Sequence, residues 1–160
     1  MSVSIQLDST ELDEALVRLE PLLDFEPAPL MAAIAALGES QTRRRIETEK
    51  TSPDGTPWVP NHNGTSILRE TGRNLLDSVA STSSATQAEW GASWEFAHVH
   101  QFGAVIEPKD AKALAFQIGG QNVFAQKVVV PARAFVGISA ENEIEIRDLV
   151  TDFLGIGGLQ

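Results

Sequence analysis

The sequence predicts an α+β fold, with N-terminal helices and a C-terminal helix packed on a mostly antiparallel sheet, in a single domain over residues 1–160. Apolar residues recur at helical spacing through most of the first 79 residues, and again after residue 140. Between these regions, short segments rich in Val, Ile and Phe alternate with turn residues, as in β-hairpins. Because the strands cluster instead of alternating with helices, we expect helices to pack on antiparallel strands.

The composition fits a globular protein and excludes several classes of function. Hydrophobic residues make up 42% of the 160 residues, and the mean hydropathy is −0.07, so the chain can bury a core. No apolar run approaches the ~18 residues that span a membrane. Residues 1–6 lack the basic and apolar parts of a secretory signal, so we expect no secretion. The absence of cysteine excludes disulfides and thiolate catalysis and fits a protein made in a cytosol.

The net charge of −10 is concentrated at the two ends of the chain. Residues 1–30 hold seven acids and one base, residues 137–160 hold five acids and one base, and the middle holds ten of each. Such a chain repels nucleic acid on average. DNA binding would therefore depend on a local basic patch.

The N-terminal half is expected to hold an extended segment and three helices. Residues 1–8 alternate as in a strand, and the helix that follows ends near Pro21. A second helix starts near Pro29, a favoured first-turn position, and runs to about residue 50. Its polar last part is expected to project into solvent or onto a partner. A third helix is predicted over residues 67–79.

Residues 94–103 are predicted to carry the chain from the helical half into the strand-rich half. Gly103 can end a short helix because glycine adopts the left-handed cap conformation at little steric cost, so we expect one or two helical turns. The alternative is an extended segment with alternate side chains on one face. We assign the rings of Phe96, Phe102 and Phe135 to the core.

The strand-rich half is expected to contain hairpins followed by the last helix. The turn residues 119–122 join two of the strands, and Pro131 ends the most β-prone segment. The predicted strands are two short ones between 81 and 91, then 105–107, 114–118 and 123–130. The last helix is predicted over 140–154, and residues 155–160 form a frayed tail.

Arg43, Arg44 and Arg45 form the densest basic run in the chain. One interpretation is a solvated helix face, paired with the nearby glutamates Glu39, Glu47 and Glu49. The other interpretation is a docking patch for an acidic protein surface or for DNA.

Residues 51–66 form a long polar loop, expected to be flexible, with turn signals on both sides of Trp58. Trp58 either folds back onto the core or is an exposed anchor for a partner, because Trp is enriched at interface hot spots. We predict a partner interface that includes Arg43, Arg44, Arg45 and Trp58.

No motif indicates catalysis, so we predict no enzyme, no cofactor and no catalytic or metal-binding residue. Nucleophile-elbow, phosphate-loop, zinc-protease and dinucleotide-binding patterns are all missing from the sequence. His98 and His100 share a face on a strand but diverge on a helix. Glu95 and His98 have Glu-x-x-His spacing, but a carboxylate-bridged metal site needs two such motifs. The alternative is a small hydrolase or metal-dependent enzyme of unknown substrate.

Four segments, in this order, carry a resemblance to a known family. They are 54–58 (Asp-Gly-Thr-Pro-Trp, after an Arg-rich helix), 67–75 (Ile-Leu-Arg-Glu-Thr-Gly-Arg-Asn-Leu), 96–103 (Phe-Ala-His-Val-His-Gln-Phe-Gly) and 130–139 (Val-Pro-Ala-Arg-Ala-Phe-Val-Gly-Ile-Ser). Together they resemble the phage virion morphogenesis proteins, the tail-completion (S-like) family that includes the Mu-like G protein. The family usually has Tyr where Phe96 stands and commonly has Pro where Ala134 stands.

The resemblance implies a structural virion-assembly protein without catalysis. Such proteins complete the tail or neck and join the tail to the filled head as ring-like homo-oligomers. The expected partners are other copies of this chain and other phage neck or tail proteins, with no membrane partner. The expected location is the virion, at the neck or tail end, and the bacterial host cytoplasm during assembly. The acidic excess would suit a surface near DNA in transit, since like charges prevent adhesion.

Overall fold

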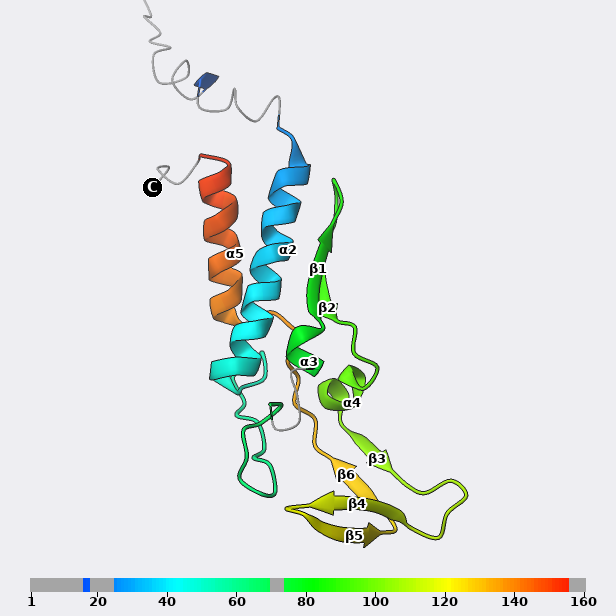
Figure 1. Cartoon of the computed structure of the whole chain (residues 1–160). Coiled ribbons are helices and arrows are strands. Elements are labelled where there is room, and N and C mark those ends of the chain that lie inside the picture. The colour runs from blue at the N-terminus through cyan, green and yellow to red at the C-terminus, as the bar shows by residue number, and fades with distance from the viewer. Residues whose placement is uncertain (1–15, 18–24, 70–73, 156–160) are drawn as a thin grey trace, which may run out of the picture.

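The computed structural model describes residues 16–17, 25–69 and 74–155, and Figure 1 shows α2 and α5 side by side at one end of an elongated chain. The helices are α2 (Pro27–Arg44), its π-helical continuation η2 (Arg45–Glu49), α3 (Asn74–Asp77), α4 (Ala97–Phe102) and α5 (Ala140–Phe153). The strands are β1 (Val79–Ser83), β2 (Ala88–Ala92), β3 (Ala104–Ile106), β4 (Leu114–Ile118), β5 (Gln121–Ala125) and β6 (Val128–Val130). The predicted segment 1–8 lies outside the described residues. So does the predicted first helix, apart from residues 16–17, which are helical.

The α+β prediction is confirmed, but the strands form three separate two-stranded antiparallel sheets instead of one sheet. These are β1–β2, β3–β6 and β4–β5. The predicted strand 123–130 is two strands, because residues 121–125 pair with β4 whereas residues 128–130 pair with β3. The predicted hairpin is confirmed, but its turn is shorter than the predicted 119–122, because residues 121–122 already pair with β4. Gly119 and Gly120 are both at positive φ (57° and 81°), as a tight two-residue turn requires.

Helix α2 lies between α5 and the β1–β2 hairpin (Figure 1). It begins at Pro27, whose fixed φ suits the first turn of a helix. Gly38 lets the helix approach the hairpin closely, since a Cβ at this position would lie 2.3 Å from Cδ2 of Trp90. At the next helix residue, Glu39, the carboxylate oxygen Oε2 accepts a hydrogen bond from the Ser81 hydroxyl at 2.8 Å. None of the described helices is both long and apolar enough to cross a bilayer.

One face of the C-terminal end of this long helix is buried in the chain's own core, whereas the helix end was expected to project into solvent or onto a partner; Glu47 and Thr48 on the other face are exposed. Thr42, Arg45 and Ile46 are each 0% exposed. The helix ends where Lys50 adopts a left-handed backbone conformation (φ 56°), and the Lys50 ammonium donates to the carbonyls of Ile46 and Ile67. The residues after the helix therefore fold back over its end.

The core lies at this buried helix end and takes side chains from segments spread along the chain. Of the three rings predicted to be buried, Phe135 is in the core at 2% exposure, but Phe96 and Phe102 are 50% and 77% exposed. The predicted short helix ended by Gly103 is confirmed as α4, yet only Ala97 of its residues is buried, so both rings turn outward. The core residues are Ile46, Trp58, Leu75, Val79, Ala97 and Phe135.

The third predicted helix is shorter than expected. Residues 70–73 lie outside the described residues, and α3 covers only 74–77. Val79 starts β1 instead of ending the helix, because it pairs with Ala92 across the β1–β2 hairpin. Tertiary pairing has here overridden a helical pattern of apolar residues.

The last helix is confirmed as α5. Ser139 and Asn142 form a capping box at its start, with the Ser139 hydroxyl accepting from Asn142 N and the Asn142 side chain accepting from Ser139 N. The helix ends before Gly155, which has a φ of 66°. The predicted tail beyond Gly155 lies outside the described residues.

Residues 103–131, which we name the β arm, extend away from the helices and contain β3 to β6 (Figure 1). No residue from 98 to 132 is buried, although this stretch is rich in Val, Ile and Phe. At its base, a Cβ on Gly103 would lie 2.9 Å from Ala132 N, so the two ends of the arm run in close contact. The arm is thus attached to a packed body without having a core of its own.

We predict that Gly38→Ala destabilises the protein by roughly 1–3 kcal/mol through overpacking against Trp90. The same change in an open helix would stabilise by up to about 1 kcal/mol. Urea unfolding followed by circular dichroism measures the difference. In a Trp90→Ala background the Gly38→Ala change is expected to become neutral or stabilising. Equal effects in both backgrounds would contradict the close contact.

Candidate functional site

Arg45 is fully buried and holds the segment after the β arm against the end of α2. Its Nη1 donates to the carbonyls of Phe135 and Gly137 at 3.1 and 3.0 Å, and its Nη2 donates to Asn142 Oδ1. Burial lowers the pKa of the guanidinium, whereas the Glu49 carboxylate, 3.7 Å from Nε, raises it. One side chain therefore joins α2, residues 135–137 and the capping box of α5.

Arg43 and Arg44 also act within the chain. Arg43 pairs with Glu39 at 3.0 Å and donates to the carbonyls of Leu76 and Val79, which joins α2 to the start of β1. Arg44 pairs with Glu49 at 2.7 Å and with Glu145 of α5 at 2.9 Å. Glu39 and Glu49 are thus partners as predicted, while no ion pair to Glu47 is found among the described residues.

The structure corrects the prediction that Arg45 and Trp58 lie on an exposed surface. Trp58 is 4% exposed, its ring packs in the core, and its indole N–H donates to Ser52 Oγ at 3.2 Å. The loop around it is held in place by the bridge between Thr51 and Pro57. Neither side chain has a surface to offer a partner. Arg43 and Arg44 keep part of their surface, and their contact with a partner stays a prediction.

Sequence reasoning missed two side chains that complete this arrangement. Gln101 Oε1 accepts from the backbone N–H groups of Phe135 and Val136, both at 3.0 Å, and its Nε2 donates to Val136 O at 3.0 Å. Arg133, 7% exposed, donates from Nε and Nη2 to Val59 O at 3.0 and 2.9 Å. Both lie inside the segments that carry the resemblance, but nothing in their residue type distinguishes a backbone-binding role from a surface role.

The four segments that carry the resemblance meet in one place. Each gives one residue to the core: Trp58, Leu75, Ala97 and Phe135. Arg45, from the Arg-rich helix before the first segment, binds the last segment. Residues from these motifs therefore contribute to how the chain folds.

The histidines do not assemble a metal site in the described part of the chain. His98 and His100 both lie on α4, where their side chains diverge, and His98 is exposed. His100 stacks on Trp94 with ring centroids 5.6 Å apart. Burial, and then the Arg133 charge, lowers the pKa of His100. No group of three or more His, Asp or Glu side chains among the described residues is arranged to bind a metal ion.

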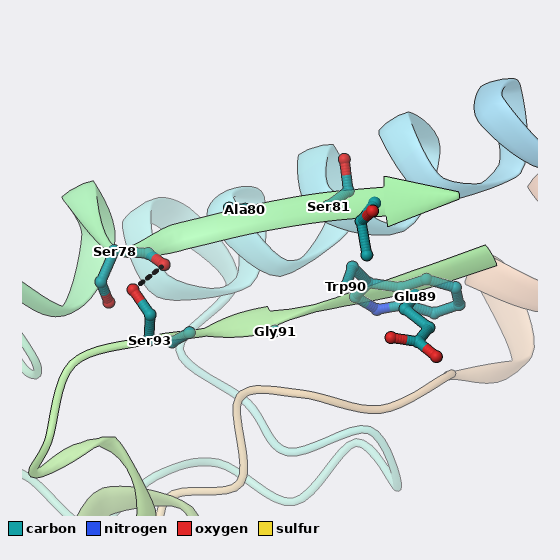
Figure 2. Close-up of a pocket in the computed structure, with 9 residues that line it drawn as sticks. Ser78, Ala80, Ser81, Glu89, Trp90, Gly91 and Ser93 are labelled. Carbon is teal, nitrogen blue, oxygen red and sulfur yellow. Dashed lines mark hydrogen bonds between the residues drawn. The ribbon is translucent and has the colours of Figure 1, made fainter. Parts of the chain in front are cut away.

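The hollow in Figure 2 lies along β1 and β2 and has a volume of about 380 Å³. Its polar groups include the hydroxyls of Ser78, Ser81 and Ser93 and the Glu89 carboxylate, and Ser93 Oγ donates to Ser78 O at 3.4 Å. No histidine is among the described residues that line it, so no imidazole lies beside a serine to accept its proton. The arrangement resembles an open sheet surface more than a catalytic cleft.

These features describe an α+β protein whose charged and amide side chains bind its own backbone. Its exposed apolar side chains lie on the arm and also on and around α4 and α5. The model of the phage virion morphogenesis family matches residues 7–155, and the chain belongs to this family. Membership supports a structural, non-enzymatic role in phage assembly and association with the virion. Comparisons with curated proteins and with solved structures gave no match.

We predict that Arg45→Met destabilises the protein by roughly 3–5 kcal/mol, because it leaves buried carbonyl and amide oxygens without a donor. The matched control is Arg147→Met, which removes the exposed Arg147–Glu143 pair of α5 and should cost no more than about 0.5 kcal/mol. Urea unfolding of both variants gives the comparison. Similar small losses would show that Arg45 does not hold residues 135–137.

A second prediction concerns acid. Hydrogen bonds from Ser81 and then Arg43 lower the pKa of Glu39, and hydrogen bonds from Gln41 and Arg44 lower that of Glu145, from 4.5 in both cases. Because the folded-state pKa values are depressed, their contribution to stability is present above pH 4.5 and is lost as pH falls through the lowered values.

Glu39→Gln combined with Glu145→Gln should therefore flatten the decline of stability in acid, as followed by thermal unfolding against pH. Glu141→Gln, which removes a carboxylate outside these ion pairs, is the control and should leave the decline unchanged. An unchanged decline in the double variant would show that these two carboxylates do not contribute.

Proposed function

We propose that this protein completes the tail or neck of a phage particle and joins the tail to the head, acting as a ring-like homo-oligomer that also contacts other neck or tail proteins. Family membership supports the assembly role. The observation that carries the finer proposal is the apolar surface that the chain leaves exposed on its β arm.

The arm and its base leave four apolar side chains more than half exposed. Phe102 is 77% exposed, Phe124 71%, Val129 63% and Val105 58%. Single exposed apolar residues are ordinary, but a group of this size on one projecting element is typical of a protein–protein contact. A subunit that works only within an assembly has a reason to keep such a surface.

The remaining surface supports the same proposal. The side chains of Arg43, Arg44 and Arg45 already bind groups of this chain. Less positive charge is therefore left on the surface to bind DNA. The net charge of −10 supports a position beside DNA in transit, because a surface of like charge does not hold the DNA. The virion neck or tail end is the location that this function requires.

The proposal is tested by deleting the coding sequence from a phage or prophage that carries it and examining the particles by electron microscopy. We expect filled heads and tails that are not joined, with joined particles restored by the wild-type chain. Phe124→Asp, an exposed change that leaves the core intact, should not restore them, whereas Glu89→Gln, an exposed change on β2 outside the arm and α5, should. Normal joined particles in the deletion would contradict the proposal.

A further inference from the structure

We infer that the β arm of one copy docks on the exposed face of α5 in the next copy, so that the ring is built by head-to-tail contacts. This inference rests on the proposed function, and it assigns the two surfaces that meet. The arm needs a partner, its charge favours a partner that is acidic and apolar, and the two surfaces lie far apart on one chain.

The arm needs a partner because it consists of two-stranded ribbons. A two-stranded antiparallel ribbon is at best marginally stable in water without further packing. Val105 and Val129 are directly paired across β3–β6, so they lie on one face, and they are 58% and 63% exposed. Phe124 of β5 is 71% exposed opposite Ala115. Burying these side chains would stabilise the arm and the contact together.

The charge of the arm indicates an acidic partner. Residues 103–131 contain three lysines and two acids, a net charge of +1 in a chain of net charge −10. Lys109 and Lys112 lie between β3 and β4, and Lys127 lies between β5 and β6. Their ammonium groups form no ion pair with any carboxylate in the described part of the chain. A surface that combines apolar side chains with unpaired positive charge favours a partner surface that combines apolar side chains with negative charge.

Helix α5 presents such a surface. Its fourteen residues hold five acids and one base, a net charge of −4. Glu141, Ile144 and Asp148 are exposed at the spacing that places them on one face, and Ile144 is 54% exposed. Ile138, just before the helix, is 52% exposed. The α5 face, defined as Ile138, Glu141, Ile144 and Asp148, is therefore complementary to the arm in charge and apolar character.

The geometry makes the contact intermolecular and directional. Figure 1 shows α5 beside α2 and the β4–β5 hairpin at the far end of the chain, so an arm does not cover its own α5 face. Two arms carry charge of the same sign, which disfavours a symmetric arm-to-arm dimer. When the arm of one copy binds α5 of the next, the first copy keeps a free α5 face and the second copy keeps a free arm. Repeating this contact forms a ring when the rotation between successive copies completes a full turn.

The test uses engineered disulfides. Because the chain has no cysteine of its own, only the introduced cysteines can form them. A variant with both Phe124→Cys and Ile144→Cys is expected to form a ladder of linked dimers, trimers and larger species under mild oxidation. Each single variant should give no ladder, since one cysteine links at most two chains. Reducing and non-reducing gels of the purified protein, and of assembled particles, give the readout.

Absence of a ladder from the double variant, in solution and in particles, would overturn the inference, as would efficient dimers from Phe124→Cys alone. Charge provides an independent check. Lys127→Glu should reduce the ladder, and adding Asp148→Lys should restore it, because the attraction is re-formed with reversed signs. Circular dichroism confirms that the exposed substitutions leave the fold intact.

The inference and the proposed function fail in different ways. A wild-type ring seen by light scattering, or wild-type protein within joined particles, without the 124–144 link would place the interface elsewhere and leave the function standing. Normal particle joining without the protein would remove the function itself.

Discussion

The fold depends on the hydrogen bonds between the buried guanidinium of Arg45 and the segment that leaves the β arm. Phe135 and Gly137 supply backbone carbonyls, and Asn142 supplies its side-chain oxygen. A buried cation is costly unless its donors are used. Nη1 and Nη2 meet this requirement, while Nε has only the Glu49 carboxylate at 3.7 Å. These bonds join the end of the long helix, residues 135–137 and the start of α5 at one point. Gln101 adds three further hydrogen bonds to the same return segment, so its backbone is fixed from both sides.

This construction divides the chain into a packed body and an arm that the body positions. Trp58, Leu75, Ala97 and Phe135 come from four separate segments and share one core, whereas residues 98–132 contribute no buried side chain. A rigid base under an unpacked apolar arm suits a subunit whose last contacts form only in an assembly. The guanidinium and amide side chains of the body bind backbone groups of the same chain. This is expected of a structural subunit in the phage virion morphogenesis family.

Local patterns in the sequence were enough to predict the fold class, the long helix, the hairpin at Gly119–Gly120, the helix ended by Gly103, and α5. They failed where contacts between residues far apart in the sequence determine the structure. Arg45 has the same residue type as Arg43 and Arg44, and only the chain folding back over it makes it buried. Trp58 had two interpretations from its loop, and packing against Ile46 and Phe135 selects the core. Phe96 and Phe102 were misplaced because ring hydrophobicity does not reveal which face of a six-residue helix meets the body. The separation of the strands into three ribbons depends on pairing partners that periodicity does not specify.

The most direct test of this division is hydrogen–deuterium exchange of the intact protein, free in solution and in assembled particles. Backbone amides of residues 42–46 and 133–137 should be protected in both states, because they belong to the packed body. Amides of residues 104–130 should exchange quickly in the free subunit and become protected on assembly, since local stability follows packing. If the arm is as protected as the body in the free subunit, or stays unprotected in the particle, the account of an arm completed by its neighbour is wrong.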